Sequence, residues 1–240
     1  MYLPYPGFFH KLNLGDVFVI MDDVQYDKRF TNRNVILDPN GPTNLTVPIN
    51  KKQKFSANML VEINNEIPWG DYHWKKIRFC YSNAKFFEKY SEYFEKIYSK
   101  KWDLLFDLDF ETVKKIMEWL EIKIPVIRES EFKVQGSGTE RLINTCKAIG
   151  ADTYISGRGG RNYMDETLFE KNNLKLEYQS YTAKPYQQRF GEKFMPDLSM
   201  IDALFNLGPV AKEIISNDVR SMEPDALTRE DVSSTSSPDG

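Results

Sequence analysis

The chain has 240 residues, 41% of them hydrophobic and 14% aromatic, so it is long enough to bury a substantial core. A formal net charge of -3 and an isoelectric point near 5.6 give no basic field, which argues against nucleic acid as a partner. Two cysteines without metal-ligand spacing, a start without a leader pattern and the lack of any membrane-length apolar run predict a soluble cytoplasmic protein without a membrane span.

The first 68 residues predict a short helix, a buried strand and a hairpin. Residues 5–14 are aromatic and fit one or two helical turns, and Gly15 leads into the apolar run 17–21. Such a run is typical of a strand buried on both faces, as in a parallel sheet covered by helices. Three β-prone runs, separated by turn-forming residues, then predict an antiparallel hairpin or meander: "VIL", "TNLTVPI" and "NMLVEIN".

Residues 69–122 predict a helical insertion. This segment contains few Gly or Pro residues, and its aromatic side chains recur three to four positions apart, as in "FFEKYSEYFEKIY". That spacing predicts three helices over about 70–80, 84–99 and 110–121.

The rest of the chain predicts a βαβ unit, a further strand and a final helix. The segment "KIPVIRESEF" contains a strand over 124–128, "GTERLINTCKAIGAD" is a helix closed by Gly150, and a strand follows over 152–155. Because the joints are short, we expect 17–21, 124–128 and 152–155 to lie in one mainly parallel sheet. A last strand in "LKLEYQSY" precedes the helical "SMIDALFNLG".

The predicted fold class is therefore α/β, with a mainly parallel sheet flanked by helices, a β-hairpin elaboration and a helical insertion. We expect one domain over residues 1–216, with its helical part at about 69–122. Residues 217–240 are rich in Ser, Asp, Glu and Pro and almost free of aliphatic side chains, so they predict a disordered tail.

A polar stretch, "DDVQYDKRFTNRN", follows the strand at 17–21. Asp22 and Asp23 come where the carboxyl end of a parallel strand normally builds a site, and they are candidate catalytic residues. The mixture of amides and cations that follows suits a ligand with phosphate and hydroxyl groups: Gln25, Lys28, Arg29, Asn32, Arg33 and Asn34. A solvated loop is the alternative, but the interleaved aromatic and β-branched residues favour a site.

A glycine-rich loop follows the strand at 152–155. Its glycines let backbone N–H groups approach an anion closely, and its arginines add charge. The candidate binding residues here are Ser156, Gly157, Arg158, Gly159, Gly160 and Tyr163. A flexible turn between strand and helix is the alternative. We expect 22–34 and 156–163 to face one another across one cleft.

Three further candidates lie in "PGFFHKL" near the start of the chain. His10 could act as an acid or base, or contact phosphate together with Gly7 and Lys11; a partly buried ring in an aromatic cluster is the alternative. Asp197 and Ser199 are further binding candidates, although helix capping explains them equally well. Two histidines without a matched pair predict no metal site.

Taken together, the motifs resemble the WbqC-like protein family over residues 1 to about 216. The matching segments are "YLPYPGFFHKL", "GDVFVIMDDVQYDKRFTNRN", "VPI", "PWGDYHWKKI", "YISGRGGRNYMDETLF" and "PDLSMIDALFNLGP". The resemblance implies a role in bacterial O-antigen or other surface-polysaccharide synthesis, as a glycine or other aminoacyl transferase acting on an amino sugar. Family members begin with a further short strand and a His-Gln-Pro triplet. We therefore expect the chain to be N-terminally short and the strand at 17–21 to have an unpaired edge.

A looser resemblance to nucleotidyltransferase-like enzymes such as pantothenate synthetase suggests ATP, with Mg²⁺, as a cofactor that activates a carboxylate as an adenylate. The leading hypothesis is an enzyme that joins a small acyl or amino-acid donor to the amino group of a nucleotide-linked deoxysugar. The alternatives are a sugar-nucleotide-binding accessory protein without catalysis, and a glycosyltransferase with a metal bound at Asp22 and Asp23. The oligomeric state stays open.

Overall fold

The computed structural model describes residues 1–27, 31–50, 53 and 56–216. The helical elements run in the order α1 (Pro6–Leu12), η2 (Asn58–Leu60), α2 (Trp69–Tyr81), α3 (Phe87–Ser99), α4 (Leu105–Trp119), η3 (Glu129–Phe132), α5 (Gly138–Ile149), η4 (Arg158–Asn162), α6 (Glu166–Lys171), α7 (Met200–Leu207) and η5 (Gly208–Ile215). The strands are β1 (Phe18–Ile20), β2 (Arg33–Asp38), β3 (Gly41–Thr46), β4 (Val126–Arg128), β5 (Thr153–Ser156) and β6 (Lys175–Tyr178). The tail predicted as disordered, 217–240, lies outside the described residues.

The predicted hairpin is confirmed. Strands β2 and β3 pair antiparallel, from Arg33 opposite Thr46 to Asp38 opposite Gly41 at the turn. Gly41 has φ +115°, a conformation that glycine adopts without strain, and the Asn40 backbone N–H donates to Asp38 Oδ1 at 2.7 Å. The third β-prone run contributes the short η2 helix and two isolated bridges, at Glu62 and Ile63, rather than a full strand.

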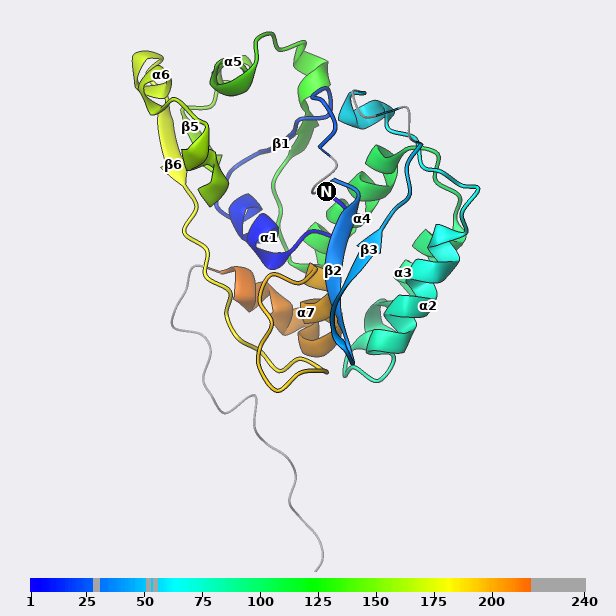
Figure 1. Cartoon of the computed structure of the whole chain (residues 1–240). Coiled ribbons are helices and arrows are strands. Elements are labelled where there is room, and N and C mark those ends of the chain that lie inside the picture. The colour runs from blue at the N-terminus through cyan, green and yellow to red at the C-terminus, as the bar shows by residue number, and fades with distance from the viewer. Residues whose placement is uncertain (28–30, 51–52, 54–55, 217–240) are drawn as a thin grey trace, which may run out of the picture.

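The predicted helical insertion is also confirmed, as α2, α3 and α4. Figure 1 shows α2 and α3 side by side next to the β2/β3 hairpin, and α2 and α3 contact each other. The aromatic stripe of α3 is buried, and the ring of Phe94 packs against the rings of Trp119 and Phe205. This packing builds one large core that joins the insertion to α1 and α7.

Two of the three strand pairs are parallel, as the α/β class predicts. Strand β1 pairs with β4, and β5 pairs with β6. The expectation that the runs 17–21, 124–128 and 152–155 share one sheet is wrong, because these two pairs form separate two-stranded sheets. Within the described part of the chain β1 has one strand partner, β4, and the N-terminally short start stays a prediction.

The β5/β6 pair carries its own small core. Side chains from α5 and α6 form a second hydrophobic cluster around Phe169, apart from the main core. In Figure 1, β5, β6, α5 and α6 lie on one side of the molecule, and the hairpin with α2–α4 lies on the other, with α1 between them. No helix in the described ranges is long and apolar enough to cross a bilayer.

Candidate functional site

The polar stretch after β1 begins with a carboxylate that is fully buried. Asp22 Oδ2 accepts hydrogen bonds from Arg128 Nε at 2.6 Å and the Ser130 hydroxyl at 2.8 Å, and its Oδ1 accepts from the Ser130 backbone N–H at 3.0 Å. Burial alone would raise the pKa of Asp22, but the hydrogen bonds from Ser130 and Arg128 outweigh burial, so this pKa is lowered. Asp22 is thus an ionised group that joins the carboxyl ends of β1 and β4.

A second buried carboxylate, Glu129, begins η3. Arg141 on α5 donates to Glu129 Oε2 from Nε at 2.9 Å and from Nη2 at 2.7 Å, and the Thr145 hydroxyl donates to Oε1 at 2.6 Å. Asp23 lies on the solvent side, with its side chain 46% exposed and its Oδ2 3.7 Å from Arg141 Nη2. We call this group the carboxylate cluster: Asp22, Asp23, Arg128, Glu129 and Arg141. Its two fully buried carboxylates are satisfied by protein donors, and Asp23 is the carboxylate that a ligand can reach.

The side-chain amides of two asparagines in the polar stretch donate hydrogen bonds to backbone carbonyls. The buried Asn32 donates from Nδ2 to the Val47 carbonyl at 2.7 Å. Asn34 donates from Nδ2 to the Leu3 carbonyl at 2.6 Å. The Asn32 bond closes the open end of the β2/β3 hairpin, and the Asn34 bond ties β2 to the first residues of the chain, so each amide has a structural donor role.

The remaining members of the stretch are dispersed. Gln25 forms an isolated antiparallel bridge with Ala57. Arg33 begins β2 and is exposed. The predicted binding residues Lys28 and Arg29 lie outside the described residues.

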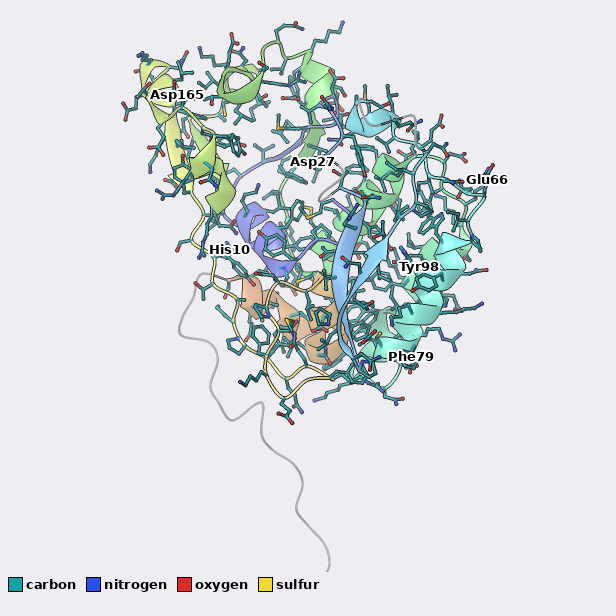
Figure 2. The ribbon with its side chains drawn as sticks, viewed as in Figure 1. His10, Asp27, Glu66, Phe79, Tyr98 and Asp165 are labelled. Atoms are coloured by element: carbon teal, nitrogen blue, oxygen red, sulfur yellow. The ribbon has the colours of Figure 1, made fainter. Side chains whose placement is uncertain are left out.

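His10 is a buried ring beside an aromatic side chain, which was the alternative interpretation of this residue. Its ring is buried, with Nδ1 2.8 Å from Gln179 Nε2 and a centroid 5.2 Å from that of Tyr181. Gln179 also donates to the Gly7 carbonyl at 2.6 Å, so this amide ties α1 to the segment after β6. Figure 2 shows His10 on the β6 side of α1 and well apart from Asp27.

The glycine-rich loop after β5 lies beside the same segment. The Ser156 hydroxyl donates to the Gly157 carbonyl at 3.0 Å, and the Arg158 guanidinium donates to the backbone carbonyl of Tyr181. Tyr163, which follows η4, is 69% exposed. The loop therefore has one exposed tyrosine, Tyr163, and one arginine, Arg158, whose guanidinium is bound to a backbone carbonyl.

Two tyrosines and an aspartate complete this surface. The rings of Tyr5 and Tyr181 meet edge to face at 6.4 Å, and burial followed by the nearby Asp197 charge raises the pKa of both hydroxyls. Ser199 instead accepts from the Ile201 N–H at the start of α7, the capping role that was its alternative. We call the set the tyrosine cluster: Tyr5, His10, Arg158, Tyr181 and Asp197.

A cavity of about 590 Å³ lies between the two parallel strand pairs. Residues 14–19 form one wall, and residues 149–155 form the other. Lys11 is the one cationic side chain in its lining, and burial lowers the pKa of this ammonium. Ligand sites in proteins commonly enclose about 300–1,000 Å³, so this cavity has the size of a small-molecule site.

Each of the two clusters is held together by its own contacts. Arg128 and Arg141 bind carboxylates in one, and Tyr181 contacts His10 and Arg158 in the other. The single cleft between 22–34 and 156–163 stays a prediction. Sequence reasoning missed Arg128 and Glu129, although Arg128 ends the run 124–128 and Glu129 follows it just as Asp22 follows the run 17–21.

The glycines of the loop differ in what they tolerate, and this gives a first prediction. A Cβ at Gly157 or Gly159 would meet nothing within 4 Å, whereas at Gly160 it would press on Ser156 and lie 2.9 Å from Met164 Cε. Gly157→Ala and Gly159→Ala should change the free energy of unfolding by less than about 0.5 kcal/mol. If the loop holds a phosphate against its backbone, both should weaken nucleotide-sugar binding in a calorimetric titration. Gly160→Ala is the contrasting variant, and should lower stability.

Fold and site define an α/β protein with a ligand-sized cavity between two parallel strand pairs. The family model described as "WbqC-like protein family" matches residues 1–214, and the chain belongs to that family. The chain is 30% identical over 217 residues to the uncharacterized protein Rv1507c of Mycobacterium tuberculosis (strain ATCC 25618 / H37Rv), covering 89% of this chain and 94% of that protein. No solved structure matches the chain significantly.

Proposed function

We propose that the chain is an amide-forming transferase that attaches a small acyl or aminoacyl group to the amino group of a nucleotide-linked deoxysugar during bacterial O-antigen synthesis. The observation that carries the proposal is the cavity of about 590 Å³ with Lys11 in its wall. Lys11 is partly buried, and its ammonium would attract the phosphates of a ligand. By contrast, the three carboxylates of the same lining, Asp16, Asp152 and Glu177, would face the hydroxyl and amino groups of the sugar.

The proposal assigns roles to groups that a ligand can reach. Lys11 and Arg158 would contact the phosphates, and Asp23 would accept the proton that the attacking amine releases. Asp23 follows Met21, which lines the cavity, by two positions. With ATP and Mg²⁺ bound, the carboxylate of the acyl or amino-acid donor would attack the α-phosphate and release pyrophosphate. The amine would then attack the adenylate carbonyl, so that the amide bond forms, AMP leaves and the amine loses a proton.

A second candidate is a sugar-nucleotide-binding accessory protein without catalysis. The observation that favours it is the use of Asp22 and His10 in internal contacts, which removes two of the three predicted catalytic residues from solvent. The metal-dependent glycosyltransferase has less support, because both oxygens of Asp22 accept protein hydrogen bonds.

A calorimetric titration of a nucleotide-linked amino deoxysugar tests the shared part of both candidates. Lys11→Met should weaken binding by about 10- to 100-fold, since a charge-assisted contact to phosphate contributes about 1.5–3 kcal/mol. Lys96→Met is the control, because Lys96 lies exposed on α3 and pairs with Glu92.

Equal affinity of the Lys11→Met and wild-type proteins would refute the proposed phosphate contact. Turnover then separates the two candidates. The transferase releases AMP and an amide-modified sugar when ATP, glycine and the sugar nucleotide are supplied together, whereas the accessory protein binds the sugar nucleotide without releasing either product.

A further inference from the structure

A second, smaller cavity of about 150 Å³ lies between β1 and α4. Its walls are mainly apolar and come from α1, β1 and α4: Phe8, Phe18, Ile20, Phe106 and Phe110. Three polar side chains interrupt this lining. The Thr31 hydroxyl donates to the Asp27 carbonyl at 2.7 Å, which leaves two to consider, Asp109 on α4 and Asn58 on η2. An apolar cavity with a few convergent polar groups is the usual form of a small-ligand site.

Both polar side chains present a buried acceptor without a donor. Asp109 is more than nine-tenths buried, and its Oδ1 has no hydrogen-bond partner among the described residues. Asn58 Oδ1 likewise has no hydrogen-bond partner among the described residues. The orientation of this amide is set because Asn58 Nδ2 donates to the Met21 carbonyl at 3.3 Å. A buried acceptor left unpaired costs about 1–3 kcal/mol, so two of them at one cavity are well explained by a ligand that donates.

The charge of the Asp109 carboxylate indicates which kind of donor fits. Asp109 Oδ2 lies 2.9 Å from the α-ammonium of Met1, at the partly exposed chain end. Burial raises the pKa of Asp109 to about 6 against the lowering effect of that ammonium, so the carboxylate is still mainly ionised at neutral pH. An ionised carboxylate with one unpaired oxygen favours a cationic donor over a neutral one.

We propose that this cavity binds the primary ammonium group of a small ligand, with Asp109 Oδ1 and Asn58 Oδ1 as its acceptors. An ammonium has three N–H donors and no acceptor, which matches two unpaired acceptors better than a hydroxyl or an amide does. The apolar walls enclose the carbon atoms next to the amine.

The inference rests on the proposed function only for the source of the ammonium. In an amide-forming transfer both the amino-acid donor and the amino-sugar acceptor carry such a group. A volume of about 150 Å³ equals that of roughly five waters at ~30 Å³ each, which suits a small amino acid. Binding is measured without turnover, so a failed transfer reaction leaves this proposal standing, and absent binding leaves the transferase proposal standing.

The test is a titration of the full chain with glycinamide, followed by NMR or calorimetry, against glycolamide, which carries a hydroxyl in place of the ammonium. Glycinamide should bind at least tenfold more tightly than glycolamide, and Asp109→Asn should abolish the difference. Asp107→Asn, at an exposed position two residues away in α4, should leave it unchanged.

A second variant and a second ligand keep the test decisive. Asn58→Ala changes a half-buried position and should weaken glycinamide binding several-fold even if Asp109→Asn fails to fold. The methyl glycoside of an amino deoxysugar tests the other source, and binding of that glycoside in place of glycinamide would assign the site to the acceptor. Equal binding of glycinamide and glycolamide, or no binding of either amine, would overturn the proposal.

Discussion

Replacing Asp22 by alanine should lower the free energy of unfolding by about 3 kcal/mol. The substitution leaves the Ser130 backbone N–H and hydroxyl without their acceptor, and it leaves Arg128 without its counter-ion. Breaking a fully buried ion pair costs about 3–5 kcal/mol, and the lower end applies here because the Arg128 side chain is 40% exposed. Urea unfolding followed by tryptophan fluorescence measures the change.

Asp23→Ala is the matched control, at the next position in the chain. The Asp23 side chain is 46% exposed, and its contact is the 3.7 Å approach to Arg141 Nη2. An ion pair at this exposure contributes at most about 1 kcal/mol, so stability should change little. The activity proposed above should nevertheless fall, because Asp23 is the reachable carboxylate. A similar loss of stability in both variants would contradict the division of the two aspartates into a structural and a reactive group.

The stability difference between wild type and Asp22→Ala should depend on pH with a definite sign. The pKa of Asp22 is lowered in the folded state, so its carboxylate stabilises the fold fully at pH values above the ordinary carboxyl pKa. That stabilisation is lost as the pH falls through the folded-state pKa of Asp22. The two proteins should therefore differ most near neutral pH and converge in acid.

The elements that the sequence predicted well are those with local causes. The α3 helix follows from aromatic residues three to four apart, and the β2/β3 hairpin follows from the turn residues at 38–41. The pairing of strands into sheets is non-local, and strands of three or four residues carry too little pattern to specify their neighbours. Prediction therefore found β1 and β5 but wrongly placed them in one sheet, where the structure has a cavity.

The candidate site shows the same limit. The position of Asp22 after a parallel strand was predictable, but its burial was not, because its donors lie 106 and 108 residues further along the chain. For the same reason His10 reads as a reactive group in sequence and as a buried ring in the structure, where Gln179 contacts it from 169 residues away. A polar residue at a strand or helix end predicts where a site can lie, and its partners decide whether the residue is free to react.

Gly208→Ala should be among the most destabilising substitutions in the chain, with a loss of about 3 kcal/mol or more in the free energy of unfolding. Gly208 ends α7 at φ +63° and ψ -136°, a combination that strains any residue with a Cβ. The added Cβ would also lie 2.5 Å from Phe86 Cδ1, whose backbone N–H bonds the Phe205 carbonyl at 3.0 Å. Strain and overpacking each cost about 1–3 kcal/mol, and they act together here.

Gly150→Ala gives the cost of a positive φ without crowding, at a ψ that residues with a Cβ adopt more readily than the ψ of Gly208. Gly150 closes α5 at φ +71° and ψ +24°, and a Cβ there would meet nothing within 4 Å. Its replacement should therefore cost only the backbone strain of the left-handed region, about 1–2 kcal/mol. Urea unfolding of both variants, with circular dichroism to confirm the folded state, gives the two costs on one scale. Equal costs would show that the Phe86 ring moves aside freely, and the close packing of α3 against the end of α7 would then contribute little to the stability of the core.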